Sequence, residues 1–114
     1  MMRLVEAAQA IGASVTGTDI TFSSVSTDTR TLQRGALFVA LRGERFDGHD
    51  FVRQALDNGA SAAMVDADYK AADLGDAASL LVVTDTRLGL GQLSKAWRNR
   101  FDLPLIAVTG SNGK

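Results

Sequence analysis

The end of the chain holds its strongest chemical signal, a glycine loop that could bind phosphate. It reads Val108-Thr-Gly-Ser-Asn-Gly-Lys114 and follows an apolar run. Glycines allow backbone N–H groups to converge on a phosphate, and the lysine adds a compact positive charge. A standard P-loop has glycine where Val108 stands, so this is a shortened variant, and a plain strand-to-loop turn is the alternative. The candidate phosphate-binding residues are Thr109, Gly110, Ser111, Asn112, Gly113 and Lys114.

A polar stretch earlier in the chain, Ser26-Thr-Asp-Thr-Arg30, places hydroxyls and a guanidinium close together. Thr27, Thr29 and Arg30 could hydrogen-bond to a nucleotide base or a phosphate. The alternative is that Ser26, Thr27 and Asp28 form local turns and Arg30 pairs with a surface carboxylate. On this stretch alone, the pattern favours the local turns.

A second loop, Gly43–His49, precedes a predicted helix whose N-terminus would attract anions. Arg45 could meet a phosphate, Phe46 could stack on a base or sugar, and Gly48 permits close backbone approach. Asp47 could instead cap the helix. The single histidine, His49, is more typical of a capping or packing residue than of a catalytic base, because acid–base work needs a positioned partner. The candidates here are Glu44, Arg45, Phe46, Asp47, Gly48 and His49.

The elements that must position these loops alternate along the chain. Apolar spacing predicts helices over 3–11, 50–58 and 87–100, with glycine caps at Gly12 and Gly59 and with Thr86 capping the last helix. That last helix has Leu90, Leu93 and Trp97 on one face, and the tryptophan is expected in the core. Continuous apolar runs predict strands over 37–41, 62–65, 80–83 and 105–108.

Two β-branched segments, 14–16 and 20–25, flank a turn signal at Gly17-Thr-Asp19 and predict a small hairpin. The polar, alanine-rich segment 66–78 predicts a loop or a frayed helical turn. From residue 37 onward the alternation predicts an α/β layered domain with a mixed, partly parallel sheet. Ligands usually bind at the carboxyl ends of such strands.

Composition narrows the function classes. The 114 residues carry a formal net charge of −1, so no global attraction to nucleic acid or to an anionic membrane is implied. The absence of cysteine excludes disulfides and thiolate metal sites, and no cluster of His and carboxylates has metal-ligand spacing. No apolar run is long enough to span a bilayer, and the start lacks a signal-peptide pattern. We therefore expect a cytoplasmic protein.

The two polar loops and the terminal loop together resemble a known family. Three features carry the resemblance: Asp28-Thr-Arg30, the run from Gly35 to Phe51 that contains GERFDGHDF, and the closing TGSNGK. They are similar, in order and spacing, to the uridine-nucleotide-binding domain and the start of the ATP loop of the Mur ligases MurE and MurF. GERFDGHDF, together with DTR where MurE usually has DSR, favours the MurF branch.

The resemblance implies an ATP-dependent, amide-forming ligase of peptidoglycan synthesis. ATP, with Mg²⁺, would phosphorylate the carboxylate of UDP-N-acetylmuramoyl-tripeptide, and the amine of D-alanyl-D-alanine would attack the acyl phosphate. By match, Thr29 and Arg30 fall in the family's first uridine loop, and Glu44, Arg45 and Phe46 fall in its second. We expect a uridine-binding domain over 1–103 and the start of a central ATP-binding domain over 104–114. We accordingly expect a piece of a longer, monomeric protein that is inactive alone.

Two alternatives stay open. One is a MurE-type ligase that adds the third peptide residue, since the amino-substrate pocket of the family lies outside this chain. The other is a non-catalytic α/β binding module in which the glycine ending is incidental.

Overall fold

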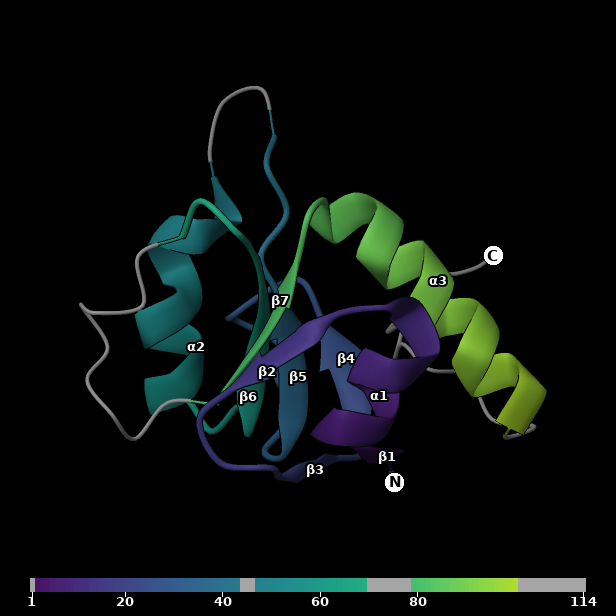
Figure 1. Ribbon diagram of the computed structural model, residues 1–114. Coiled ribbons are helices and arrows are strands. Elements are labelled where there is room, and N and C mark those ends of the chain that lie inside the picture. The colour runs from purple at the N-terminus through teal and green to yellow at the C-terminus, as the bar shows by residue number, and fades with distance from the viewer. Residues whose placement is uncertain (1, 44–46, 70–78, 101–114) are drawn as a thin grey trace, which may run out of the picture.

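The computed structural model describes residues 2–43, 47–69 and 79–100 (Figure 1). The helical elements are α1 (Leu4–Ile11), the short 3₁₀ helix η1 (Gly48–Phe51), α2 (Val52–Asp57) and α3 (Thr86–Arg100). The strands are β1 (Met2–Arg3), β2 (Ser14–Thr16), β3 (Thr21–Phe22), β4 (Ser24–Ser26), β5 (Ala36–Val39), β6 (Ala62–Asp66) and β7 (Leu80–Val83).

Five of the strands in these ranges form one sheet, in the order β2-β7-β6-β5-β4. The neighbours from β4 to β7 run parallel, and β2 joins β7 antiparallel. Every residue of β5 and β6 is buried, as expected for strands covered on both faces. The predicted mixed, partly parallel sheet is therefore confirmed.

Helices cover both faces of this sheet (Figure 1). The α1 and α3 side packs on alternate strand residues that include Leu37, Val39 and Met64. The α2 side packs on the residues between them, such as Phe38 and Ala63. This alternation follows from the period of two along a strand. It divides the apolar interior into two clusters, one on each face of the sheet.

The short two-stranded pairing of β1 with β3 shows where one prediction was wrong. The segments 14–16 and 20–25 do not form a hairpin, although Gly17 adopts the positive φ of 90° that a turn requires. Val15 in β2 pairs with Leu81 in β7, whereas β3 pairs with β1 and β4 pairs with β5. Local turn chemistry was read correctly, but long-range pairing decides where each strand lies.

The helix predictions hold with two adjustments. The predicted helix 50–58 is divided into η1 and α2, and η1 begins at Gly48. The cap of α3 is Asp85 rather than Thr86, because the Asp85 carboxylate accepts hydrogen bonds from the backbone N–H groups of Arg87 and Leu88 at 2.9 and 3.2 Å. Trp97 is buried, as predicted, and stacks on Phe22 with ring centroids 5.9 Å apart. The predicted strand 105–108, and most of 66–78, lie outside the described residues.

Candidate functional site

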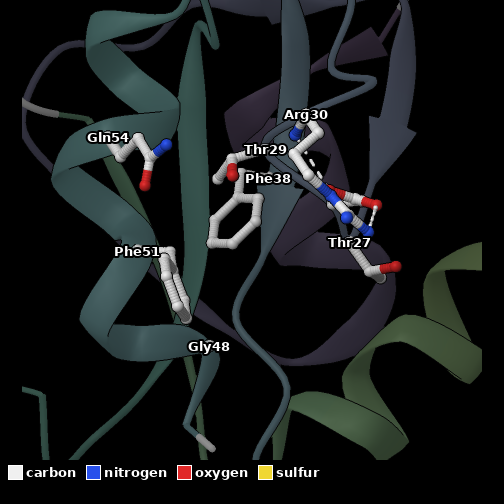
Figure 2. A pocket seen from close by; sticks show the side chains of 8 residues that line it. Thr27, Thr29, Arg30, Phe38, Gly48, Phe51 and Gln54 are labelled. Carbon is white, nitrogen blue, oxygen red and sulfur yellow. Dashed lines mark hydrogen bonds and ion pairs between the residues drawn. The ribbon is translucent and has the colours of Figure 1, made fainter.

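A cavity of about 510 Å³ lies where the first polar loop faces η1 and α2, beyond the carboxyl end of β4. Its described lining residues are Thr27, Asp28, Thr29, Arg30, Phe38, Gly48, Phe51 and Gln54. Figure 2 shows Phe38 and Phe51 on one side and Thr27 and Arg30 on the other. Segments that the sequence separates by a strand and a loop therefore share one cavity, at the sheet edge where ligands usually bind.

The first wall of the cavity is held mostly by contacts within its own loop, and the Asn58 side chain at the end of α2 adds a bond to the Thr29 carbonyl at 3.3 Å. The Ser26 hydroxyl donates to the backbone carbonyl of Asp28 at 2.9 Å and accepts from the Asp28 N–H at 3.1 Å. The Arg30 guanidinium makes an ion pair with Asp28, with 3.0 Å between Nη2 and Oδ2. The hydrogen bonds and charge of Arg30 hold the pKa of Asp28 below its ordinary value. The predicted local turns are thus present, and the carboxylate that Arg30 meets belongs to the same loop.

Arg30 also stands at the open side of the cavity. Its side chain is 85% exposed although it is paired. An exposed ion pair contributes little to stability and is easily exchanged for another partner. The guanidinium can therefore leave Asp28 for a ligand anion at small cost.

The second wall is formed by η1, which begins at Asp47. The Asp47 carboxylate caps η1 by accepting from the His49 N–H at 2.9 Å. Gly48 lies so close to the segment after β5 that a Cβ there would stand 2.8 Å from backbone atoms of Leu41. The capping role predicted for Asp47 is confirmed. Position 48 requires glycine because any larger side chain would collide with the backbone of Leu41.

His49 is buried and bonded at both ring nitrogens. Nδ1 lies 2.6 Å from Oδ1 of Asp47, and Nε2 accepts the backbone N–H of Asp66 at 3.1 Å. Because Nε2 is an acceptor, the proton of the neutral ring is on Nδ1. This agrees with the prediction of a capping or packing histidine rather than a catalytic base.

Arg42 closes these contacts into a cycle, which we call the Arg42–His49 ring and which consists of Arg42, Asp47, His49 and Asp66. Arg42 Nε lies 2.6 Å from Oδ2 of Asp66, and Nη1 lies 2.6 Å from Oδ2 of Asp47. The hydrogen bond from Arg42 holds the pKa of Asp66 below its ordinary value. Burial works to raise the pKa of Asp47, but the hydrogen bonds from the backbone N–H and the side chain of His49 lead the interactions that outweigh it, and the pKa is lowered.

Sequence reasoning missed Arg42 and Asp66. Asp66 is 7% exposed at the end of a strand whose other residues are buried and apolar. A carboxylate that ends such a strand signals a partner, because buried charges are almost always paired. The candidates Glu44, Arg45, Phe46 and Thr109 to Lys114 lie outside the described residues.

Two classes of site find no support in the described parts of the chain. No group of His, Asp or Glu side chains in residues 2–43, 47–69 and 79–100 is arranged to hold a metal ion. Among the helices of those same ranges, none combines the length and apolar character that a bilayer crossing requires.

Comparison with known proteins decides the family. The Mur ligase family, catalytic domain, matches residues 21–98, which include both walls of the cavity. The chain belongs to the Mur ligase family. This Mur ligase chain spans about a fifth of the length of the curated relatives it matches.

The relatives include both branches considered above. The chain is 46% identical over 96 residues to the UDP-N-acetylmuramoyl-tripeptide–D-alanyl-D-alanine ligase of Synechocystis sp., covering 84% of this chain and 21% of the relative. It is 44% identical over 100 residues to the UDP-N-acetylmuramoyl-L-alanyl-D-glutamate–2,6-diaminopimelate ligase of Chlorobaculum tepidum, covering 86% and 19%. These identities are close, so overall similarity to these two relatives separates the branches poorly.

A solved structure shares the fold. The crystal structure of MurF from Acinetobacter baumannii superposes with a TM-score of 0.65 at 35% identity, covering 82% of this Mur ligase chain and 20% of that chain. The α/β architecture predicted from the sequence is thereby confirmed as the one found in this family.

Proposed function

We propose that this Mur ligase chain binds the uridine diphosphate part of UDP-N-acetylmuramoyl-tripeptide in the cavity between the first polar loop and η1. The observation that carries the proposal is that both polar loops reach this one cavity: Thr27, Thr29 and Arg30 from the first, and Gly48 from the second. The cavity volume of about 510 Å³ is within the range of ordinary small-molecule sites.

The lining of the cavity suits a nucleotide. Phe51 provides aromatic surface for a base, and Arg30 provides a cation at the open side for a phosphate. The hydroxyls of Thr27 and Thr29 can both donate and accept, as the polar edge of uracil requires. Arg45 and Phe46, with Glu44, belong to the same proposal from their place in the sequence.

We further propose that the whole protein is a ligase that joins D-alanyl-D-alanine to the tripeptide in the cytoplasm. ATP would supply the phosphoryl group that activates the tripeptide carboxylate, since a carboxylate is a poor acyl donor until it has a better leaving group. The loop from Thr109 to Lys114 would hold the ATP phosphates, and Mg²⁺ would offset their charge. In this proposal residues 1–103 form the uridine-binding domain, and 104–114 begin the ATP-binding domain.

The diaminopimelate-adding branch is the second candidate. It is favoured by the 44% identity to the Chlorobaculum tepidum ligase. Against it stand the DTR and GERFDGHDF sequences, which resemble the D-alanyl-D-alanine branch. Ligase assays of the whole protein with each amino substrate, at saturating UDP-peptide, would separate the two.

Titration calorimetry of the 114-residue chain tests the uridine site directly. The unaltered chain should bind UDP-N-acetylmuramoyl-tripeptide and, more weakly, UDP, whereas ADP serves as the control for base recognition. Arg45→Ala should weaken binding by about 1–3 kcal/mol if that guanidinium meets a phosphate. Equal binding of ADP and UDP would contradict the proposed uridine specificity, and no binding of either uridine ligand would contradict the site.

The ATP loop has a separate test in the whole protein. Lys114→Ala should lower kcat about 10²-fold or more, since the lysine's contact strengthens as charge moves during phosphoryl transfer. Affinity for the UDP-peptide should hardly change, because a different part of the chain would bind it. Loss of UDP-peptide affinity with normal turnover at saturation would reverse the assignment of the two nucleotides. The 114 residues alone should show no substrate-dependent phosphate release.

A further inference from the structure

The Arg42–His49 ring joins parts of the chain that would otherwise be independent. Arg42 follows β5, Asp47 and His49 begin η1, and Asp66 ends β6. The ion pair between Arg42 and Asp66 connects residues 24 positions apart, and the bond from the Asp66 N–H to His49 connects residues 17 apart. The ring therefore ties the start of η1 to the carboxyl end of the buried strand β6.

The element tied down in this way is part of the cavity wall. Gly48 and Phe51 line the cavity, and both belong to the four-residue η1. One turn of 3₁₀ helix has few hydrogen bonds of its own and is weakly held by them. The ring, the Asp47 cap and the 2.7 Å hydrogen bond from the Gly48 N–H to the Leu41 carbonyl provide the missing anchorage.

The buried members of the ring do not themselves reach the cavity. His49 is 7% exposed, Asp66 is equally buried, and neither lines the cavity. Their effect on a ligand would therefore pass through η1 rather than through direct contact.

We infer that Arg42, Asp47, His49 and Asp66 act as positioning residues for the uridine-nucleotide site, with His49 in the neutral form that carries its proton on Nδ1. The inference rests on the proposed function of the cavity. The ring holds η1 so that Gly48 and Phe51 are in place before the nucleotide arrives, which lowers the ordering cost of binding.

The side chain at position 49 must donate one hydrogen bond and accept another on its opposite side, and a rigid imidazole can do both. The Nδ1–H faces the Asp47 carboxylate, and Nε2 faces a backbone N–H. A neutral imidazole meets both needs. A glutamine oxygen can replace Nε2 as acceptor, but Asp47 then loses the bond from Nδ1 and keeps those from the residue 49 N–H and from Arg42. A phenylalanine fills the space without either side-chain bond.

The tautomer can be measured without any ligand. His49 is the chain's single histidine, so a ¹⁵N spectrum of histidine-labelled protein at neutral pH contains the signals of one imidazole. We expect a protonated Nδ1 and an unprotonated Nε2. The opposite tautomer, or a fast average of both, would contradict the assignment of the proton to Nδ1 and of the acceptor role to Nε2.

Binding measurements on three variants test the positioning role. His49→Phe removes both hydrogen bonds of the imidazole and should weaken UDP affinity about ten-fold. His49→Gln keeps an acceptor and should recover part of the lost affinity. Asp19→Ala is the matched control: it also breaks an arginine ion pair and a carboxylate bond to a backbone N–H, but at the start of α1. It should leave UDP affinity unchanged.

Folding is monitored in each variant through the fluorescence of Trp97, the chain's single tryptophan. If His49→Phe does not fold, Asp66→Asn takes its place, since it weakens the pair with Arg42 and keeps an oxygen for its other bonds. Normal UDP affinity in folded His49→Phe, or in Asp66→Asn if that variant is needed, would overturn the positioning role alone. Failure of the unaltered chain to bind UDP would instead overturn the proposed function, and this inference with it.

Discussion

The two polar clusters beside the cavity, the first loop and the Arg42–His49 ring, differ in the sequence range of their contacts. In the first loop, Ser26, Asp28 and Arg30 bond to one another across two positions of sequence, and the Arg30 side chain is 85% exposed. In the Arg42–His49 ring, Arg42 reaches Asp66 across 24 positions, and these two side chains are 50% and 10% exposed, against 85% and 38% for Arg30 and Asp28. Charged groups of the same types thus form a local turn in one place and a tertiary connection in the other.

This difference assigns different physical roles to the two walls. Contacts between near neighbours in an exposed loop can be broken and remade at little cost, so the first loop is suited to adapt to a ligand. Contacts that tie the end of β6 to the segment between β5 and η1 in a partly buried setting are costly to leave unmade, so the ring is suited to hold a shape. Substitutions in the ring should accordingly change stability as well as binding, whereas substitutions in the loop should change binding without changing stability.

Asp66→Ala should give the largest effect. The substitution leaves Arg42 without its main partner, and the backbone N–H of Asp68 loses its hydrogen-bond acceptor. We expect a loss of about 2 kcal/mol or more in the free energy of unfolding, because a partly buried network loses one of its members. Urea unfolding followed by Trp97 fluorescence measures it, with Asp28→Ala as the exposed counterpart. Equal losses of unfolding free energy in the two variants would show that the two clusters contribute alike to stability.

Arg30→Ala should have the opposite profile. The guanidinium lies at the open side of the cavity, so its loss should weaken UDP affinity about ten-fold through a missing charge-assisted bond. The urea midpoint should stay where it is, because the pair with Asp28 is exposed. Calorimetry and urea unfolding on the same preparation provide both numbers. A shifted midpoint with unchanged affinity would make Arg30 a structural residue.

Acid should destabilise the Arg42–His49 ring, with the next largest effect. The folded pKa values of Asp66 and Asp47 are below the ordinary 3.8, so their contribution to stability is present above that pH and is lost as pH falls through the folded values. The free energy of unfolding should therefore decline as the solution is acidified below about pH 5. Asp66→Asn should flatten this decline. A curve as steep as that of the unaltered chain would show that Asp66 is not one of the groups responsible.

Asp28→Asn should give the smallest effect. Its carboxylate bonds only within its own loop among the contacts described above, and an amide oxygen can still accept the Arg30 N–H. We expect no measurable shift of the urea midpoint at pH 7. UDP affinity should be unchanged or slightly higher, since Arg30 then has a weaker competitor for a ligand phosphate. Clear destabilisation would show that the first loop is also a fixed scaffold.

The sequence predicted what depends on local pattern. Apolar runs located β5, β6 and β7, helical spacing located α1 and α3, and loop chemistry brought Asp47 and His49 forward as capping and packing residues. These features follow from neighbours within a few positions, where propensity and periodicity have meaning.

The failures in strand pairing and in the site involve partners that are distant in sequence. The hairpin was wrong because Val15 pairs with Leu81 rather than with its near neighbours. Arg42 and Asp66 were missed because each is ordinary in its own segment and becomes informative only when the sheet brings them together. The cap of α3 failed for a local reason: Asp85 and Thr86 are adjacent, and both residue types cap helices, so type alone does not choose between them.

The antiparallel strand β2 has a consequence for how the chain is made. Residues 14–16 leave the ribosome early, yet their partners in β7 are synthesised only after the rest of the described sheet. During that interval α1 and β2 lack the surface that buries their apolar side, because α1 packs mainly on α3. The segment 4–16 must wait for β7 and α3, so this sheet closes only after residues 80–100 have been synthesised. A nascent chain stalled before residue 80 would expose α1 to chaperones and proteases.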